Sequence, residues 1–368
     1  MYGKRSDPLG GTCEKIPKYL WNDWRWQIQN RITAAEEIEK FIALDEHEKA
    51  ALACDTAFSL TPHYARLLTG EGEALRRLVI PTDFEHVHGC GEEADSLHEE
   101  KYRPVPGIFH RYPHKALLMA TSFCASKCRY CTRSRLVSED IRSVTSDTAL
   151  DEALAYLRRT PAIRDVLISG GDPLTLSDEK IDRLLGELSE IKHIEFMRIG
   201  TKTPAVLPQR FTPALIKILK KYRPLFLSLH FIHPAELSPE TLCVCNKLAD
   251  AGIPLGSQTV LLKGVNDDAE VLHRLFTQLI KNRVKPYYLY QCDPIPGSTH
   301  FRTPIETGLN IMRSLLGRTT GYAIPQFVVD TGGGKIPLLP NYAVGNDAGF
   351  IDLQGFDGTV THYPRITV

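Results

Sequence analysis

The chain has 368 residues, with 44 basic and 44 acidic side chains, so its formal net charge is zero. This balance argues against nucleic acid or an anionic membrane as a partner held by bulk electrostatics. Hydrophobic residues make up 43% of the chain, and no apolar run approaches the roughly 18 residues of a membrane span. The N-terminus, MYGKRSDPLG, is polar, so we expect no secretory signal. Length and composition predict a globular protein of more than one domain.

The first 105 residues are predicted to form a separate helical region. WNDWRWQIQNRI places apolar residues at helical spacing. Thr33, three residues before Glu36, predicts a capping box at the start of the helix TAAEEIEKFIAL. Further helices are expected over DEHEKAALACDTAF and TPHYARLL. The charged stretch 88–107 is predicted to be a loop that ends this region.

Short apolar runs alternate with amphipathic stretches from residue 106 to residue 300. This alternation is typical of consecutive βα units around a parallel sheet. No G-x-G-x-x-G follows the first run, which disfavours a dinucleotide-binding domain. The pattern predicts an α/β fold, a partial TIM-like barrel of six βα units. The expected strands are 116–120, 165–170, 194–200, 225–230, 255–262 and 286–293, with helices over 147–160, 177–191, 212–222, 238–252 and 267–282 between them.

Three cysteines follow directly on the first predicted strand. Cys124, Cys128 and Cys131 are spaced C-x3-C-x2-C and could bind an iron–sulfur cluster or a metal ion. Four thiolates usually hold a 4Fe-4S cluster, so three would leave one iron with an open coordination position. Nine cysteines are too few for a disulfide framework in a chain of this length, so we expect a reducing, cytoplasmic environment. The other six are expected to be mostly ordinary buried thiols.

Polar residues recur at the ends of the later predicted strands, where functional residues of βα barrels gather. Each of them alone could be a turn residue, a helix cap or a satisfied buried group. Their recurrence at one edge of the sheet favours a shared pocket. They are Gly170, Gly171 and Asp172 after the second strand, His230 at the end of the fourth, Gln258 in the fifth, and Asp293 after the sixth.

A second group of candidates lies in FVVDTGGGKIPLLPNY, where Asp330 closes an apolar run and three glycines lead into Lys335. This is not a phosphate-binding P-loop, because Val329 and Ile336 occupy positions where that motif requires Gly and Ser or Thr. A lysine on such a turn could form a Schiff base with a carbonyl cofactor such as pyridoxal phosphate. On spacing alone, a solvent-exposed turn lysine is the simpler interpretation.

A third group precedes the first strand, in HRYPHK. Arg111, Tyr112 and Lys115 could bind phosphate oxygens and stack on a ring. A charged loop that caps the barrel is the alternative interpretation.

The cysteine spacing resembles the cluster motif of radical S-adenosylmethionine (SAM) enzymes, and the whole chain resembles the lysine 2,3-aminomutase family. Matching segments are WNDWRWQ, CRYCTR, LISGGDPL, RIGTKTP, VLPQR, PLGSQTVLLKGVND, PYYLYQCD, HFRTP and FVVD with the following GGGK, spread over about residues 20–360. The resemblance implies a radical SAM barrel over 106–300, preceded by the helical region 1–105 and followed by a C-terminal segment, 301–368.

The resemblance also implies three cofactors, namely a [4Fe-4S] cluster, SAM and pyridoxal 5′-phosphate. It implies a 1,2-amino shift that converts L-lysine to L-β-lysine and begins with a radical derived from SAM. The implied residues are Cys124, Cys128 and Cys131 for the cluster, Gly170, Gly171, Asp172, His230 and Gln258 for SAM, Lys335, Arg111 and Tyr112 for pyridoxal phosphate, Arg133 for the substrate carboxylate, and Asp293 and Asp330 for the distal ammonium.

The chain departs from the family pattern in three places. Asp268 stands where family members with a zinc site have a cysteine, and the C-terminus THYPRITV has none, so we predict no zinc and altered subunit packing. Lys115 replaces an arginine often found at that position. The loop from Asp330 to Lys335 is slightly shorter than is typical, which affects where Asp330 would lie.

Several alternatives stay open at this point. The substrate could be arginine, ornithine or glutamate, or the enzyme could supply β-lysine for modification of a translation factor. Outside this class, the cysteines could hold a cluster passively for electron transfer. As partners we expect a small amino acid, an electron donor such as flavodoxin or ferredoxin, and a second copy of the chain, with no nucleic acid and no membrane.

Overall fold

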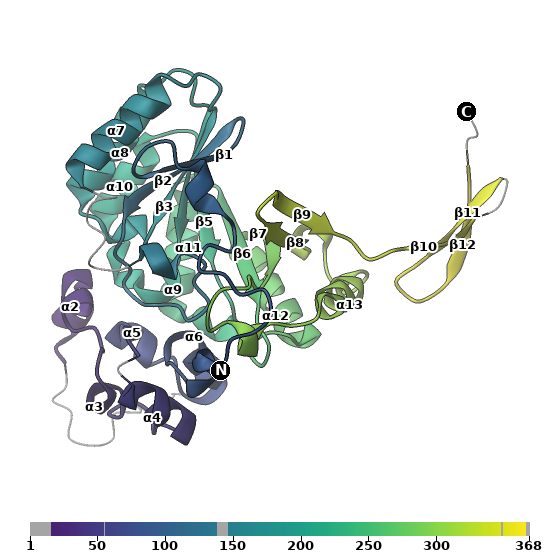
Figure 1. Cartoon of the computed structure of the whole chain (residues 1–368), viewed down its shortest axis with the longest axis horizontal. Coiled ribbons are helices and arrows are strands. Elements are labelled where there is room, and N and C mark those ends of the chain that lie inside the picture. The colour runs from purple at the N-terminus through teal and green to yellow at the C-terminus, as the bar shows by residue number, and fades with distance from the viewer. Residues whose placement is uncertain (1–15, 55, 138–145, 347–348, 366–368) are drawn as a thin grey trace.

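Figure 1 shows the computed structural model of the chain, which describes residues 16–54, 56–137, 146–346 and 349–365. The N-terminal segment MYGKRSDPLG and Cys13 lie outside the described residues. The expectation that this segment carries no secretory signal therefore stays a prediction. None of the described helices is long and apolar enough to cross a membrane.

A nine-stranded sheet forms the centre of the molecule, with its strands in the order β1 to β9. Strands β2 to β8 pair in parallel, whereas β1 and β9 pair antiparallel at the two ends. The predicted α/β partial barrel is therefore confirmed. The strands are β1 Ile108–Tyr112, β2 Lys115–Thr121, β3 Asp165–Gly170, β4 Phe196–Thr201, β5 Leu225–His230, β6 Leu255–Leu261, β7 Lys285–Gln291, β8 Gln326–Thr331 and β9 Gly334–Leu338.

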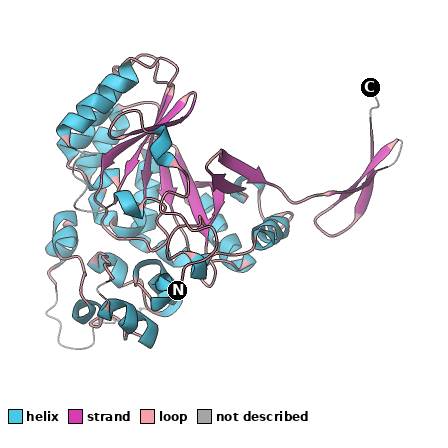
Figure 2. Ribbon diagram, in the orientation of Figure 1, coloured by secondary structure: helices cyan, strands magenta, loops and turns pink. Residues whose placement is uncertain are grey.

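Helices cover the outside of this sheet, as Figure 2 shows. Each of the five helices predicted for the barrel is present and begins at a side chain that caps it, because Ser, Thr and Asp oxygens accept hydrogen bonds from the free N–H groups of a first turn. The capping residues are Ser146, Ser177, Thr212, Ser238 and Asp268. The helices of the barrel are α7 Asp147–Arg158, α8 Asp178–Ser189, α9 Thr203–Val206, α10 Pro213–Lys221, α11 Pro239–Asp250, α12 Ala269–Lys281 and α13 Ile305–Leu315.

The N-terminal region is helical as predicted, but its helices are short. The predicted capping box of Thr33 and Glu36 is wrong: the N-cap is Ala34, and Glu37 accepts hydrogen bonds from the backbone of Thr33 and Ala34. The predicted long helix from Thr33 is accordingly a single turn. The helices of this region are α1 Lys18–Trp21, α2 Trp24–Gln29, α3 Ala35–Ile38, α4 Glu46–Ala53, α5 Pro62–Ala65 and α6 Arg76–Val79.

This helical region holds the loop that carries the three cysteines. The backbone N–H of Lys127 donates to the carbonyl of Ser59, and that of Arg129 donates to Leu78. The Arg129 guanidinium also forms a two-pronged ion pair with Glu85. Because these contacts tie the loop to the helical region, that region contributes directly to the position of the thiols.

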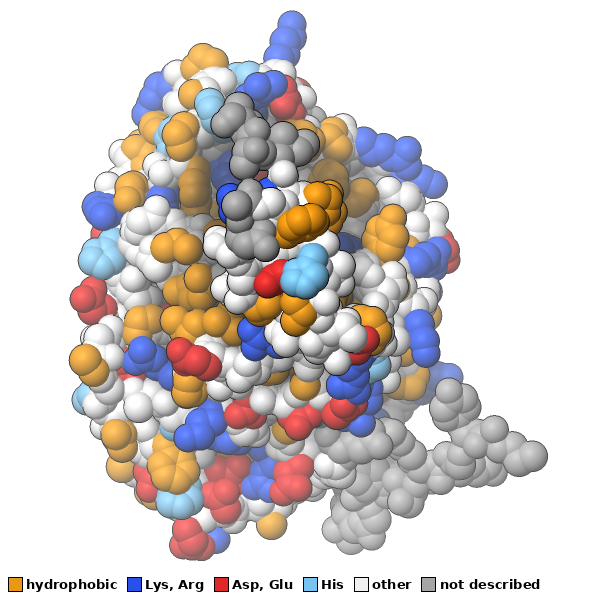
Figure 3. Space-filling model, turned by 90° about the vertical axis from the view of Figure 1, so that its right-hand side faces the viewer, with side chains coloured by type: hydrophobic (Ala, Val, Ile, Leu, Met, Phe, Trp, Pro, Cys, Tyr) orange, Lys and Arg blue, Asp and Glu red, His pale blue; other side chains and the backbone are white. Residues whose placement is uncertain are grey.

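A small second sheet, of β10 Ala343–Asn346, β11 Phe350–Gln354 and β12 Val360–Pro364, projects away from the barrel on an extended segment (Figure 1). No described residue of these strands is buried. Figure 3 looks onto this side of the molecule and shows apolar side chains among the exposed ones. Since β8 and β9 belong to the main sheet, we propose that the core extends to Leu338 and that this small sheet forms the separate C-terminal part.

Candidate active site

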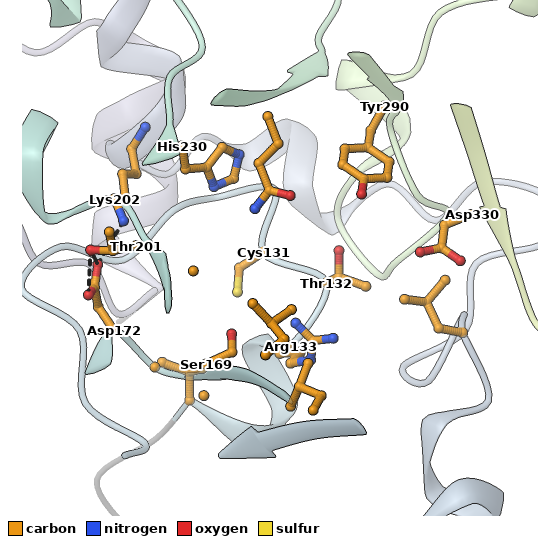
Figure 4. Close-up of a pocket in the computed structure, with 18 of the residues that line it drawn as sticks. Cys131, Thr132, Arg133, Ser169, Asp172, Thr201, Lys202, His230, Tyr290 and Asp330 are labelled. Carbon is orange, nitrogen blue, oxygen red and sulfur yellow. Dashed lines mark hydrogen bonds between the residues drawn. The ribbon is translucent and has the colours of Figure 1, made fainter. Parts of the chain in front are cut away.

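One cavity of about 350 Å³ lies at the carboxyl ends of the parallel strands. Its lining includes every residue that the sequence predicts for the cluster, the cofactors or the substrate, although these come from positions between 111 and 335. Figure 4 labels five of them, namely Cys131, Arg133, Asp172, His230 and Asp330. The parallel arrangement explains this convergence, because strand ends of one direction meet at one edge of the sheet. The residues are Arg111, Tyr112, Cys124, Cys128, Cys131, Arg133, Gly170, Gly171, Asp172, His230, Gln258, Asp293, Asp330 and Lys335.

The three cysteines of the loop after β2 are free thiols that line the cavity together. Burial raises the pKa of each thiol, to about 11 for Cys131. The positive charge of Lys202 acts in the opposite direction on Cys128. Among the described residues, no three His, Cys, Asp or Glu side chains are grouped so that they could hold a metal ion.

The turn after β3 packs against the cysteine loop. The N–H groups of Gly171 and Asp172 donate to the carbonyls of Thr121 and Phe123. A Cβ on Gly170 or on Gly171 would collide with these same two carbonyl oxygens, and Gly170 has a φ of +126°, which favours glycine. The two glycines thus allow the turn after β3 to pack directly against the backbone of the cysteine loop.

Asp172 is buried, and both of its oxygens are already bonded within the chain. Its carboxylate accepts from the Thr201 hydroxyl at 2.7 and 2.9 Å and from the backbone N–H groups of Lys202 at 2.8 Å, Thr203 at 3.0 Å and Leu174 at 3.1 Å. Burial raises the pKa of this carboxyl, against the effect of these bonds. Asp172 lines the cavity and ties the end of β4 to the turn after β3.

His230 and Gln258 lie side by side on β5 and β6, whose register pairs them. Burial and the nearby Lys202 charge lower the pKa of His230 to about 3, so its ring is neutral. The His230 Nε2 atom is buried without a hydrogen-bond partner among the described residues. Tyr287 donates a long hydrogen bond of 3.4 Å to Gln258. His230 Nε2 on this wall of the cavity is therefore available to bind a ligand.

Arg133 and Glu99 form a two-pronged ion pair at the cavity wall. The Arg133 Nε donates to Glu99 Oε2 at 3.0 Å, and Nη2 donates to Oε1 at 2.6 Å. Burial, the largest single influence, would lower the pKa of Arg133, but the charge and hydrogen bonds of Glu99, together with nearby Cys131 and Asp330, outweigh it and the pKa is raised. In Figure 4 Arg133 lies between Ser169 and Asp330. A guanidinium so placed can bind a carboxylate.

Asp330 and Lys335 face each other across the β8–β9 hairpin, in which they are directly paired. The Lys335 Nζ lies 2.5 Å from Asp330 Oδ2, and Arg111 Nη1 lies 3.1 Å from Oδ1. The backbone N–H of Lys335 donates to the Tyr112 hydroxyl at 3.0 Å. The three-glycine turn thereby brings the lysine amine, one carboxylate and the residues before β2 into one cluster.

Asp293, after β7, is held differently from Asp330. Among the described residues, only one side chain donates a hydrogen bond to Asp293, namely the neutral Thr132 hydroxyl at 2.9 Å. Burial raises the pKa of this carboxyl to about 6, a rise that nearby Asp330 reinforces and that Thr132, Lys335 and Arg133 oppose. Asp293 is a half-buried anion that lacks a close cationic partner, so a positively charged ligand would be stabilised beside it.

Some cavity residues are not evident from the sequence. Glu99 and Tyr102 come from the charged stretch predicted to be a boundary loop, and Lys202 follows β4, whose end carried no candidate. The expectation that the remaining cysteines are mostly buried is also wrong. Cys245 and Cys292 are buried, whereas Cys54, Cys90 and Cys243 are exposed.

Comparison with known proteins gives the family. The model of the radical SAM superfamily matches residues 118–276, and the model described as lysine-2,3-aminomutase matches residues 312–367. The L-lysine 2,3-aminomutase of Clostridium subterminale is 45% identical over 93% of this chain and 84% of its own length. A putative L-lysine 2,3-aminomutase of Aquifex aeolicus is 44% identical over 95% of this chain and 96% of its own. The glutamate 2,3-aminomutase of Clostridioides difficile is 39% identical over 96% and 83%. This chain belongs to the lysine 2,3-aminomutase family of radical SAM enzymes.

Proposed function

We propose that this protein converts L-lysine to L-β-lysine by moving the amino group from carbon 2 to carbon 3. The observation that carries the proposal is the joint presence, in one cavity, of the Arg133 guanidinium and of two acidic side chains, Asp293 and Asp330. Such a cavity matches an amino acid that carries a carboxylate at one end and an extra ammonium at the other. The names of the relatives support this choice.

The chain's residues fit the cofactors of the family. Three free thiols on one loop line the cavity, as a cluster with one open iron requires, and His230 Nε2 is an unused buried polar atom on the adjoining wall. Arg111 Nε is likewise buried without a partner among the described residues, close to Lys335. When bound, SAM and the [4Fe-4S] cluster supply a radical, and pyridoxal phosphate supplies a π-system that stabilises the migrating centre.

We assign the cluster to Cys124, Cys128 and Cys131, and the SAM site to the walls formed by the glycine turn, His230 and Gln258. In this assignment Asp172 acts by holding the SAM-facing backbone of the turn, since both carboxylate oxygens are already bonded.

Lys335 is assigned to pyridoxal phosphate, with Arg111 and Tyr112 beside it. A lysine attacks a carbonyl only as the neutral amine, so the proton on Nζ must leave first. The Asp330 carboxylate, 2.5 Å from Nζ, is placed to accept that proton and release it to solvent, which leaves Asp330 ionised when the substrate binds. Tyr112 fixes the lysine backbone through its hydroxyl. These contacts fix the position of the Lys335 amine independently of the cofactor.

Substrate selection follows from the charges of the cavity. Arg133 binds the α-carboxylate, and Asp293 and Asp330 attract the distal ammonium. A glutamate side chain would instead bring a second carboxylate next to Asp293. Two like charges about 4 Å apart repel by about 4 kcal/mol at the dielectric typical of such sites. The acidic end of the cavity therefore favours lysine over glutamate, the substrate named for the 39% identical relative.

The remaining expectations about partners stay proposals. We propose a reducing, cytoplasmic setting with flavodoxin or ferredoxin as electron donor, because exposed thiols and a cluster require reducing conditions. We also propose self-association, since a three-stranded sheet with no buried described residue has no core of its own. The absence of zinc remains a prediction from the sequence. In the structure the Asp268 side chain caps α12.

The direct test is an anaerobic assay of the reconstituted protein with SAM, pyridoxal phosphate and a chemical reductant. Parallel reactions contain lysine, arginine, ornithine or glutamate, and chromatography identifies the products. We expect β-lysine from lysine and little product from glutamate. Isomerisation of another amino acid without formation of β-lysine would show that the substrate is wrong. A protein that binds a cluster but isomerises none of the four would favour a passive electron-transfer role.

A further inference from the structure

The proposed reaction assigns a role to Arg133 but none to Glu99, which is paired with it. Glu99 lies in the short turn Glu99–Tyr102 and is buried. Its two oxygens bind Nε and Nη2, the side edge of the guanidinium. Among the described residues, Nη1 has no protein acceptor. The end edge of Arg133, formed by Nη1 and the second hydrogen of Nη2, is thus left for another carboxylate.

The chain holds Glu99 firmly in this place. The backbone N–H of Glu99 donates to Asp95 Oδ1 at 2.9 Å, and that of Glu100 donates to Oδ2 at 3.0 Å. Asp95 in turn forms an ion pair with Arg135 at 3.0 Å. Arg133 and Arg135 are both close to the cluster loop, so the Glu99 turn is anchored to the same segment that carries the arginine.

The same turn also reaches the opposite part of the cavity. The Tyr102 hydroxyl donates to the carbonyl of Gly332 at 3.3 Å, in the turn that precedes Lys335. The segment from Asp95 to Tyr102 therefore bridges the arginine and the lysine hairpin. A support of this kind keeps a binding group within the narrow range of orientations that a reaction requires.

We infer that Glu99 is a positioning residue, which fixes the plane of the Arg133 guanidinium so that its end edge receives the substrate α-carboxylate. A free arginine side chain has several rotatable bonds, and ordering it during binding costs affinity. The two-pronged ion pair with Glu99 orders the Arg133 side chain before the substrate binds. The inference rests on the proposed function, because it takes the ligand of Arg133 to be an α-carboxylate.

The test compares L-lysine with 1,5-diaminopentane, which is lysine without its carboxylate. Binding of each to the holoenzyme without reductant is followed by the change in coenzyme absorbance, so the measurement needs no turnover. Variants E99A and E99Q remove this ion pair, and E99Q keeps the side-chain size in case E99A fails to fold. E100Q is the matched control: Glu100 lies in the same turn and pairs with Arg135, but it does not line the cavity.

We expect E99A and E99Q to weaken lysine binding by about 10- to 30-fold and diaminopentane binding by less than 2-fold, as for loss of about 1.4–2 kcal/mol. E100Q should leave both unchanged. Equal weakening of both ligands would show that Glu99 serves only the fold and would overturn the inference. Tighter lysine binding in E99A would overturn it too, because Glu99 would then compete with the substrate. If wild type fails to bind lysine but binds another α-amino acid, the proposed substrate fails, and the same comparison is made with that ligand and its decarboxylated form.

Discussion

The Asp293→Asn variant removes one negative charge from the cavity and leaves the shape of the side chain in place. Asp293 has a neutral hydrogen-bond donor, Thr132, as its side-chain partner among the described residues, and burial raises its pKa to about 6. Asparagine can still accept from Thr132. The variant therefore isolates the charge that we assign to the distal ammonium of lysine.

Two effects of opposite sign follow. A pKa raised from 3.8 to about 6 means that, above pH 6, the ionised group costs the unliganded fold about 3 kcal/mol. Asparagine avoids this cost. In the complex, however, the variant loses a charge-assisted hydrogen bond of about 1.5–3 kcal/mol, a factor of about 10–150 in affinity.

The assay pairs steady-state kinetics at pH 8 with urea unfolding of the protein without substrate. We expect a KM for lysine about 10- to 150-fold higher, with equal or greater resistance to urea. Asp250→Asn is a suitable control, because Asp250 is exposed and pairs with Arg283 away from the cavity. An unchanged KM would refute the assignment of Asp293, and a clear loss of stability would refute the account of its buried charge.

Three further predictions concern other parts of the cavity. In the wild type, the KM for lysine should rise about tenfold per pH unit below about pH 6, as Asp293 takes up a proton, and a pH series on D293N should lack this rise. Lys335→Ala should lose the absorbance of bound pyridoxal phosphate while keeping its iron content, and a spectrum like that of wild type would rule out the assigned role. In Asp172→Asn, an amide NH2 would face backbone N–H groups that donate to the carboxylate in the wild type. Urea unfolding should therefore show a free energy of unfolding lower by about 3 kcal/mol. Unchanged stability would contradict the role of Asp172 in holding β4.

The strands and helices of the barrel could be predicted because apolar runs and helix caps are local signals. The strand β8 was missed as a member of the sheet, although its run FVVD was noticed, because pairing with β7 depends on the chain returning through α13. Cysteine spacing and strand-end positions likewise predict that the three cysteines, the glycine turn, His230, Gln258 and Asp293 share one cavity, since parallel strands bring their ends together.

The contacts of the site could not be predicted in the same way. Nothing in the stretch 88–107 distinguishes Glu99 from the acidic residues around it, and its pairing with Arg133 follows only from the folded path of that loop. The occupied oxygens of Asp172 are another case. Its position after two glycines suggested a ligand contact, but the acceptor role depends on the end of β4, some 30 residues later.

The migration of the amino nitrogen can be followed directly with labelled lysine. Lysine labelled with nitrogen-15 at its α-amino group and with deuterium at carbon 3 is incubated anaerobically with the holoenzyme, and the product is analysed by NMR. We expect β-lysine with nitrogen-15 on carbon 3 and with part of the deuterium on carbon 2. Nitrogen-15 released as ammonium, or recovered only in unchanged lysine, would contradict the account.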